Sequence, residues 1–93
     1  MEILHKDDGK TGVFYIEQAG EQVAEMRYKW DGTSIIIDHT LVNPILGGKG
    51  VGKQLVDRAV AFAREKKITI VPICSFVERV LNFDNRYQDV LKK

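Results

Sequence analysis

The stretch from Gly47 to Lys53 constrains this sequence more than any other. Directly before a long amphipathic segment it holds four glycines within six residues: Gly47, Gly48, Gly50 and Gly52. Glycines at this density would weaken a helix interior, but they suit a place where the backbone must approach a ligand closely. Exposed N–H groups at a helix start bind anions, and Lys49 or Lys53 would add a positive charge. The loop therefore predicts a site for a phosphate or pyrophosphate.

The residues that follow the loop predict a helix and then a strand. From Val51 to Lys66 the apolar residues recur with helical periodicity and share one half of a helical wheel: Val51, Leu55, Val56, Ala59, Val60, Phe62 and Ala63. The short apolar run from Ile68 to Ile73 then reads as a strand. Strand, helix and strand in this order indicate a parallel pairing across the helix.

The first half of the chain predicts three antiparallel strands. Val13 to Gln18 is rich in aromatic and β-branched residues, and Ser34 to Val42 has the same character before Asn43-Pro44 ends it. Between them, apolar residues at Ala24, Met26, Tyr28 and Trp30 alternate with charged ones. This period of two indicates a sheet with one buried face, and Asp31-Gly32 is a hairpin signal. His5 is expected on the surface.

A second helix is predicted from Ser75, because Ser75 and Glu78 have the spacing of a capping box. Asp84 is expected to cap a last short turn through Tyr87. The fold class is therefore α+β with a mixed sheet: antiparallel N-terminal strands, then a β-α-β unit and a C-terminal helix. A length of 93 residues suits one domain over residues 1–93.

Composition excludes several classes of function. The formal net charge is +1, so no bulk attraction draws the chain to nucleic acid or to an anionic membrane. One cysteine and two histidines are too few for a zinc site, and no metal is expected. A single cysteine also forms no intramolecular disulfide, which favours a reducing, cytoplasmic location. No apolar stretch is long enough for a signal peptide or a membrane span.

Two nucleotide-binding motifs fit the loop poorly. Gly47, Gly52 and Lys53 have the spacing of a Walker A loop, but Gln54 stands where Ser or Thr would hold magnesium. A dinucleotide fingerprint needs a third glycine three residues after its second, whereas Gly48, Gly50 and Gly52 are two residues apart. A Walker-type nucleotide binder is therefore a disfavoured alternative.

The loop instead resembles the pyrophosphate loop of the GNAT acetyltransferase superfamily, with Gly50 and Gly52 at its two small positions and Gly47 where Arg or Gln is usual. The chain is similar to a compact GNAT-like subfamily through three further segments: Asp38-His39-Thr40, Pro72-Ile73-Cys74-Ser75 and Tyr87-Gln88-Asp89. This resemblance implies acetyl-CoA as cosubstrate. It implies that the pyrophosphate lies on residues 47–53, including Lys49 and Val51, and that the pantetheine arm bonds to backbone near Leu41 and Val42.

Two side chains are candidates for catalysis. Cys74 directly precedes the predicted helix start, where a thiol can have a lowered pKa, and it would act as acid for the leaving thiolate or accept the acetyl group transiently. Its alternative is a small buried residue. His39 would serve as base or as partner of Cys74, if their strands are neighbours. Its alternative is a half-buried histidine hydrogen-bonded to Asp38 or Thr40.

The sequence thus predicts a GNAT-like protein that moves acetyl from acetyl-CoA to an amine or thiol acceptor. The alternative is a non-catalytic acyl-CoA-binding or regulatory module, because the chain lacks the first helices and last strands of larger GNAT enzymes, which help to form the acceptor site. Loss of those strands leaves a sheet edge that must pair or be covered. A monomer or weak homodimer is expected.

Overall fold

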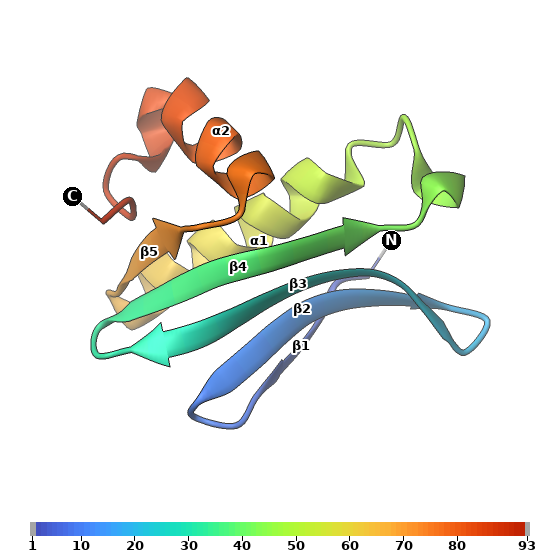
Figure 1. Cartoon of the computed structure of the whole chain (residues 1–93), viewed down its shortest axis with the longest axis horizontal. Helices are drawn as coiled ribbons and strands as arrows, with labels where there is room; N and C mark the ends of the chain where they lie inside the picture. The colour runs from blue at the N-terminus through green and yellow to red at the C-terminus, as the bar shows by residue number, and fades with distance from the viewer. Residues whose placement is uncertain (1, 93) are drawn as a thin grey trace.

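A computed structural model describes residues 2–92 and places five strands in one mixed sheet (Figure 1). The strands lie in chain order: β1 (Leu4–Asp7), β2 (Thr11–Gln18), β3 (Glu21–Asp31), β4 (Ser34–Val42) and β5 (Thr69–Pro72). Pairing is antiparallel from β1 through β4 and parallel between β4 and β5. The predicted fold class is therefore confirmed.

Helix α1 (Val51–Lys66) runs across one face of this sheet and builds the core (Figure 1). Its bounds are those predicted from the helical periodicity. All seven apolar residues assigned to one half of the helical wheel are buried: Val51, Leu55, Val56, Ala59, Val60, Phe62 and Ala63. They pack against the inward side chains of β2, β3 and β4, among them Phe14, Met26 and Ile37. The alternation expected in β3 therefore has a physical cause, because one face meets this helix.

The N-terminal strand β1 was not predicted, and the surface position expected for His5 is wrong. His5 lies in β1 opposite Phe14, and the two rings stack with centroids 4.2 Å apart. Its Nε2 lies 2.7 Å from the hydroxyl of Tyr28. The sheet therefore begins with four antiparallel strands instead of three, because a short strand of mixed polarity can pair through its backbone and a few aromatic contacts.

The predicted capping box at Ser75 is also wrong. Helix α2 (Ser75–Phe83) has Cys74 as its N-cap, and its first hydrogen bond runs from the N–H of Glu78 to the carbonyl oxygen of Cys74 at 2.9 Å. Ser75 is already inside the helix, so its hydroxyl is one residue too late to cap it. The last short turn is confirmed: Asp84 accepts a hydrogen bond from the N–H of Arg86 at the start of η2 (Asn85–Tyr87).

The C-terminal residues cover the outer edge of β5. The N–H of Ile70 donates to the carbonyl oxygen of Val90 at 2.6 Å, and the N–H of Lys92 donates to the oxygen of Ile70 at 3.0 Å. This bridge satisfies backbone groups that the short β5 would otherwise expose. Among the described residues, no helix is long and apolar enough to cross a bilayer.

Asp7 anchors the β1 edge and gives a stability test. Burial opposes ionisation of its carboxyl, but hydrogen bonds from Tyr28, Gly9 and Trp30 outweigh it and lower the pKa of Asp7. A lowered folded-state pKa contributes stability that is present at neutral pH and is lost as pH falls through that pKa. We expect Asp7→Asn to cost about 1 kcal/mol at pH 7, a small value because the residue is exposed.

Thermal unfolding from pH 7 down to pH 3 measures this effect. The variant should lose less stability on acidification than the wild type, so the two curves converge at low pH. Asp31→Asn removes a carboxylate from the same sheet for which the described residues record no side-chain hydrogen bond, and it is the matched control. Parallel curves for Asp7→Asn and the wild type would contradict the assigned role.

Candidate active site

Halfway along β4, the positions whose side chains point to the helix side of the sheet shift by one residue. Tyr28 pairs with Ile37 and Arg27 pairs with His39, so Asp38 is one extra residue on β4, a β-bulge. Beyond the bulge, Thr40 pairs with Met26, which is fully buried. The extra residue therefore turns the side chains of Thr40 and Val42 toward the helix side of the sheet.

Strands β4 and β5 separate at the same point. Their pairing runs only from Ser34 to Ile37 on β4. The carbonyl oxygen of Ile37 then accepts hydrogen bonds from the N–H groups of both Ile73 and Cys74, each at 3.0 Å, as the chain turns into α2. After this point the second half of β4 has β3 on one side and, among the described residues, no strand on the other. An extended polar ligand can pair with such an edge.

The glycine loop leads from the end of β4 into α1. Gly50 is the N-cap of α1 and has a positive φ of 66°, a conformation that glycine adopts without strain. The first helical hydrogen bond runs from the N–H of Gln54 to the oxygen of Gly50 at 3.0 Å. The N–H groups of Val51, Gly52 and Lys53 therefore precede the helical ladder and point out of its positive end. This arrangement fits an anion.

Gly47 contributes differently from the other loop residues. Its N–H donates to the carbonyl oxygen of Pro44 at 2.9 Å, which closes the short helix η1 (Pro44–Leu46). The side chain of Asn43 caps the same turn by accepting from the N–H of Ile45 at 3.0 Å. The N–H of Gly47 is thus already engaged within the protein, so this residue shapes the loop instead of presenting a donor.

Gly52 is required by a close contact with α2. A Cβ atom placed there would lie 2.7 Å from Cζ of Phe76, which is closer than real side chains come. The Phe76 ring therefore lies directly against the first turn of α1. This contact fixes the start of α2 against the glycine loop.

These elements enclose one cleft of about 440 Å³ between the end of β4, the glycine loop and α2. It is lined by Thr40, Val42, Leu46, Gly47, Gly48, Gly50, Val51, Gly52, Lys53 and Phe76. Most of the predicted loop residues therefore meet Val42 in one place. Two predicted residues lie outside its lining: Lys49 is exposed, and Leu41 is 57% exposed and pairs with Glu25 on β3.

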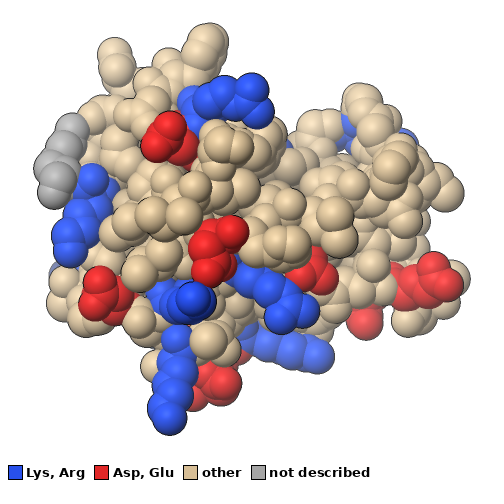
Figure 2. Space-filling model, viewed as in Figure 1, with Lys and Arg blue, Asp and Glu red and all other residues tan. Residues whose placement is uncertain are grey.

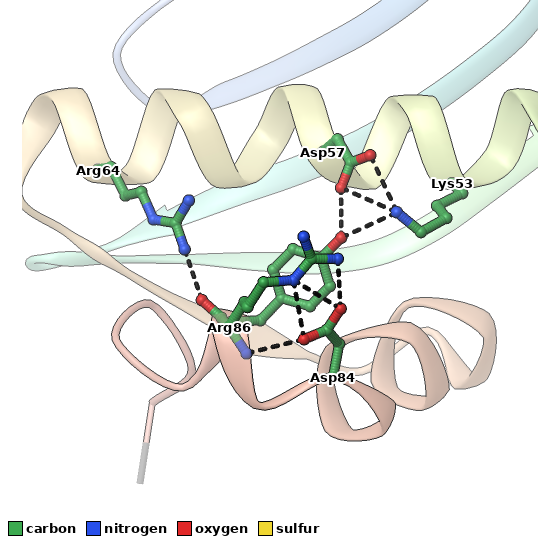
Figure 3. A network of polar contacts seen from close by, with 6 residues as sticks. Lys53, Asp57, Arg64, Asp84 and Arg86 are labelled. Carbon is green, nitrogen blue, oxygen red and sulfur yellow. Dashed lines mark hydrogen bonds and ion pairs between the residues drawn. The ribbon is translucent and has the colours of Figure 1, made fainter.

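Lys53 is held at the edge of the cleft by a polar network (Figure 3). Its Nζ lies 3.1 Å from the hydroxyl of Tyr87 and 3.2 Å from a carboxylate oxygen of Asp57, and the Tyr87 hydroxyl donates to Asp57. The bonds to Tyr87 and Asp57 raise the pKa of Lys53 above its ordinary value. Its ammonium group is therefore charged and oriented before any ligand arrives.

Cys74 lies beside the cleft at the start of α2. Its half-buried thiol donates a hydrogen bond to Oγ1 of Thr40 at 3.6 Å. Burial opposes ionisation of the thiol, but the N–H groups of Val77 and Phe76 and the hydroxyl of Thr40 outweigh it, so the pKa of Cys74 lies below its ordinary value. A thiol with these neighbours is a better nucleophile at neutral pH than an ordinary cysteine.

The structure does not bring His39 and Cys74 together, so their predicted partnership is wrong. Thr40 points toward Cys74, and its neighbour His39 therefore points to the opposite face of the sheet. There its Nε2 lies 3.3 Å from a carboxylate oxygen of Glu25, and the histidine side chain is 48% exposed. The bulge at Asp38 causes this separation.

Sequence reasoning missed Thr40 and Phe76 as site residues. The apolar run Ile35-Ile36-Ile37 has no period of two that could break at Asp38-His39, so the sequence carries no signal for the bulge that turns Thr40 inward. Phe76 follows Ser75 in the predicted second helix, and nothing in the sequence indicates that its ring meets Gly52. Among the described residues there is also no group of three or more histidine, cysteine or acidic side chains that could hold a metal ion.

The contact between Cys74 and Thr40 predicts a measurable shift in thiol reactivity. Replacing Thr40 with Val removes a hydroxyl that can donate to the thiolate, so the pKa of Cys74 should rise. The pH midpoint of the iodoacetamide alkylation rate measures that pKa. It should move upward in Thr40→Val and stay in place in Thr33→Val, a matched change in the exposed turn between β3 and β4. An unchanged midpoint in Thr40→Val would contradict the contact.

Comparison with known proteins gives a consistent picture. A family model described as GCN5-related N-acetyl-transferase matches residues 13–90. The chain is similar to a GCN5-like candidate N-acetyltransferase from Staphylococcus aureus, with 37% identity and a TM-score of 0.72 over 98% of this chain and 87% of that one. A search of curated proteins finds no significant match.

Larger acetyltransferases share the fold. A ribosomal-protein-alanine N-acetyltransferase from Brucella melitensis is 22% identical, with a TM-score of 0.59 over 70% of this chain and 50% of its own. An aminoglycoside acetyltransferase from an uncultured soil sample is 16% identical, with a TM-score of 0.64 over 94% of this chain and 62% of its own. The chain thus spans between half and two thirds of these enzymes.

Proposed function

This chain belongs to the GCN5-related N-acetyltransferase family, and on that premise we propose that it binds acetyl-CoA in the cleft of β4, the glycine loop and α2 and transfers the acetyl group to an amine or thiol acceptor. One observation carries the proposal. A single cleft joins the first turn of α1 to the unpaired half of β4, and the thiol of Cys74 contacts Thr40, one of the residues that line it.

The pyrophosphate fits the first turn of α1. The N–H groups of Val51, Gly52 and Lys53 lie at the positive end of the helix, where the helix dipole and free donors stabilise two negative phosphates most strongly. Lys53 adds a compact positive charge at the cleft edge. Gly48 and Gly50 carry no side chains, so the backbone can approach the phosphate oxygens closely.

The pantetheine arm fits the second half of β4. Pantetheine is an extended chain with two amides, and the free side of β4 from Thr40 to Val42 offers backbone donors and acceptors with which such a chain can pair. The apolar side chains of Val42 and Leu46 and the ring of Phe76 line the same cleft and would cover the methylene groups. This placement brings the thioester toward Thr40 and Cys74.

Cys74 is proposed as a transient acetyl acceptor. Its thiolate attacks the thioester carbonyl carbon, a bond from that carbon to Sγ forms, and the bond to the coenzyme A sulfur breaks, which releases coenzyme A as the thiolate. An acceptor amine or thiol then attacks the acetyl-cysteine carbonyl carbon, and the bond from that carbon to Sγ breaks, which restores the Cys74 thiolate. The acceptor's proton passes through solvent to the released coenzyme A thiolate. The lowered pKa of Cys74 raises the fraction of thiolate, which is the form that this nucleophilic role needs. His39 lies on the opposite face and is assigned no proton transfer with the thiol.

Calorimetric titration tests the binding proposal. We expect acetyl-CoA and coenzyme A to bind, and ATP with magnesium to bind at least about tenfold more weakly. The cleft continues along β4, and ATP has no pantetheine arm that could occupy this part of it.

Gly52→Val should weaken acetyl-CoA binding by at least about tenfold, because the new side chain pushes Phe76 into the cleft. Ala61→Val adds bulk on the exposed face of α1 and is the control. Tight binding of ATP without binding of acetyl-CoA would contradict the proposal.

Intact-protein mass after incubation with acetyl-CoA tests the covalent step. The wild type should gain the mass of one acetyl group, and Cys74→Ser should gain none. Hydroxylamine should remove the adduct, because a thioester is cleaved far faster than an amide. An adduct that persists in Cys74→Ser would rule out this residue as the acceptor, and an unmodified wild type that still turns over would leave direct transfer to the acceptor as the mechanism.

A non-catalytic acyl-CoA-binding module is the second candidate. It is favoured by the fact that the chain covers only 50% and 62% of the two larger acetyltransferases compared above. Release of free coenzyme A from acetyl-CoA in the presence of a panel of amines and thiols separates the two candidates. Turnover with any acceptor excludes the module, and binding without turnover across the panel favours it.

A further inference from the structure

We propose that the sheet face opposite the helices binds the same face of a second copy of this chain, with the strands of the two sheets running in opposite directions. Helices α1 and α2 bury only one face of the sheet, where Met26 and Ile37 lie. On the other face of strands β1 to β4, Lys6, Arg27 and Leu41 are exposed. This proposal does not depend on the proposed function.

Two neighbouring rows of side chains cross this open face, and they differ in the sign of their charge. Because residues paired across strands share a face, the strand register defines both rows. The acidic row consists of Leu4, Tyr15, Glu25 and Leu41. The basic row lies two residues away on each strand and consists of Lys6, Val13, Arg27 and His39. The face is therefore able to complement itself.

One arrangement of two copies lays each row on the other. A two-fold axis that crosses the strands between the rows places Glu25 of one copy over Arg27 of the other, and Tyr15 over Val13. The same contacts then occur twice, as in every two-fold interface. An axis parallel to the strands would instead lay each basic row on its own copy, where like charges repel. The charges therefore select the antiparallel arrangement.

The ion pair within each copy leaves Arg27 able to serve a partner. Its Nε lies 2.6 Å from a carboxylate oxygen of Glu25, yet the Arg27 side chain remains 62% exposed. The planar guanidinium group has further N–H donors that can reach a second carboxylate. In the proposed dimer, two such pairs face each other head to tail and form a network of four alternating charges. A network of this kind contributes more than an isolated surface pair.

The partner would also cover an exposed leucine. Leu41 is 57% exposed at the end of the acidic row, and the proposed axis places the partner's His39 over it. Burial of apolar surface adds to the attraction between the charges. The neighbouring Thr40 and Val42 line the cleft on the helix side of the sheet, so the dimer leaves that cleft open.

A hollow of about 540 Å³ lies on this face beside the basic row. Its lining includes Lys6, Thr11, Val13, Arg27, Lys29 and Asp38. Asp7 and Asp8 at its rim already accept hydrogen bonds from within the chain, and Asp38 lies 3.4 Å from Nζ of Lys29. The proposed axis brings the exposed Glu17 of the partner over this hollow, because Glu17 lies two residues beyond the acidic row on β2. Its carboxylate would meet the cations there.

The size and charge of the face suit a copy of the same chain. Figure 2 shows acidic side chains at the right, where the β2–β3 hairpin lies in Figure 1, and basic ones mixed with acidic ones over the middle and left. Mixed signs favour a self-complementary partner over a polyanion such as nucleic acid. The molecule extends 37 × 30 × 20 Å, so its broad face has room for the roughly 800 Å² that each partner of a stable interface buries.

Sedimentation velocity of the full chain, combined with charge reversal, tests the proposal. The wild type should associate as its concentration rises from about 10 to about 500 μM, a range that suits a polar, transient interface. Association should weaken when salt is raised from about 50 to about 500 mM, because salt screens the charges between the copies. Arg27→Glu and Glu25→Lys should each weaken self-association at least about tenfold, because each lays like charges on one another.

Mixing the two variants is the decisive step. In a mixed dimer of Arg27→Glu with Glu25→Lys, both contacts between the rows again join opposite charges, so an equimolar mixture should associate as the wild type does. The double variant Glu25→Lys/Arg27→Glu keeps an ion pair within each copy and should also associate with itself, which covers the case in which a single variant fails to fold. Glu65→Lys makes the same charge change on the exposed side of α1 and should change nothing.

Three results would overturn the proposal. A wild type that stays monomeric up to about 500 μM at low salt shows that the face does not bind a second copy. Association that both single variants leave intact assigns the contact to another surface. Single variants that remain monomeric when mixed, together with a double variant that does not associate, contradict the antiparallel placement of the two rows.

Discussion

The carbonyl oxygen of Ile37 accepts hydrogen bonds from the N–H groups of both Ile73 and Cys74, and at this atom β4 and β5 part. Up to Ile37 the two strands are paired, and beyond it one strand becomes a helix. The free half of β4, the position of the thiol and the direction of α2 all follow from this separation. A β5 that stayed paired to the end of β4 would leave no room for a ligand.

Two local features shape the cleft that opens where β4 and β5 separate. The extra residue Asp38 reverses the facing of β4, which sends Thr40 toward Cys74 and leaves His39 on the far side. The contact between Gly52 and Phe76 then fixes α2 against the start of α1. The same few residues thereby place the first turn of α1 and the Cys74 thiol beside one cleft.

Much of the fold and part of the cleft could be predicted from the sequence, and most of the features that could not be predicted depend on contacts between residues far apart in the chain. The bounds of α1, the fold class and the position of the glycine loop follow from periodicity and glycine density, which are local properties. The pairing of β1, the bulge at Asp38 and the meeting of Gly52 with Phe76 depend on residues far apart in the chain. The capping error at Ser75 was a shift of one residue, which helix signals rarely resolve. His39 was misplaced because a single extra residue in a strand exchanges its two faces.

In the proposed complex, acetyl-CoA occupies the cleft between β4 and the glycine loop. Backbone amide shifts recorded during titration with acetyl-CoA test it residue by residue. We expect the largest shifts at residues 40–42 and 48–53, with smaller ones at the start of α2. Shifts confined to the charged face of the sheet around Lys6 and Arg27, with the glycine loop unmoved, would contradict it.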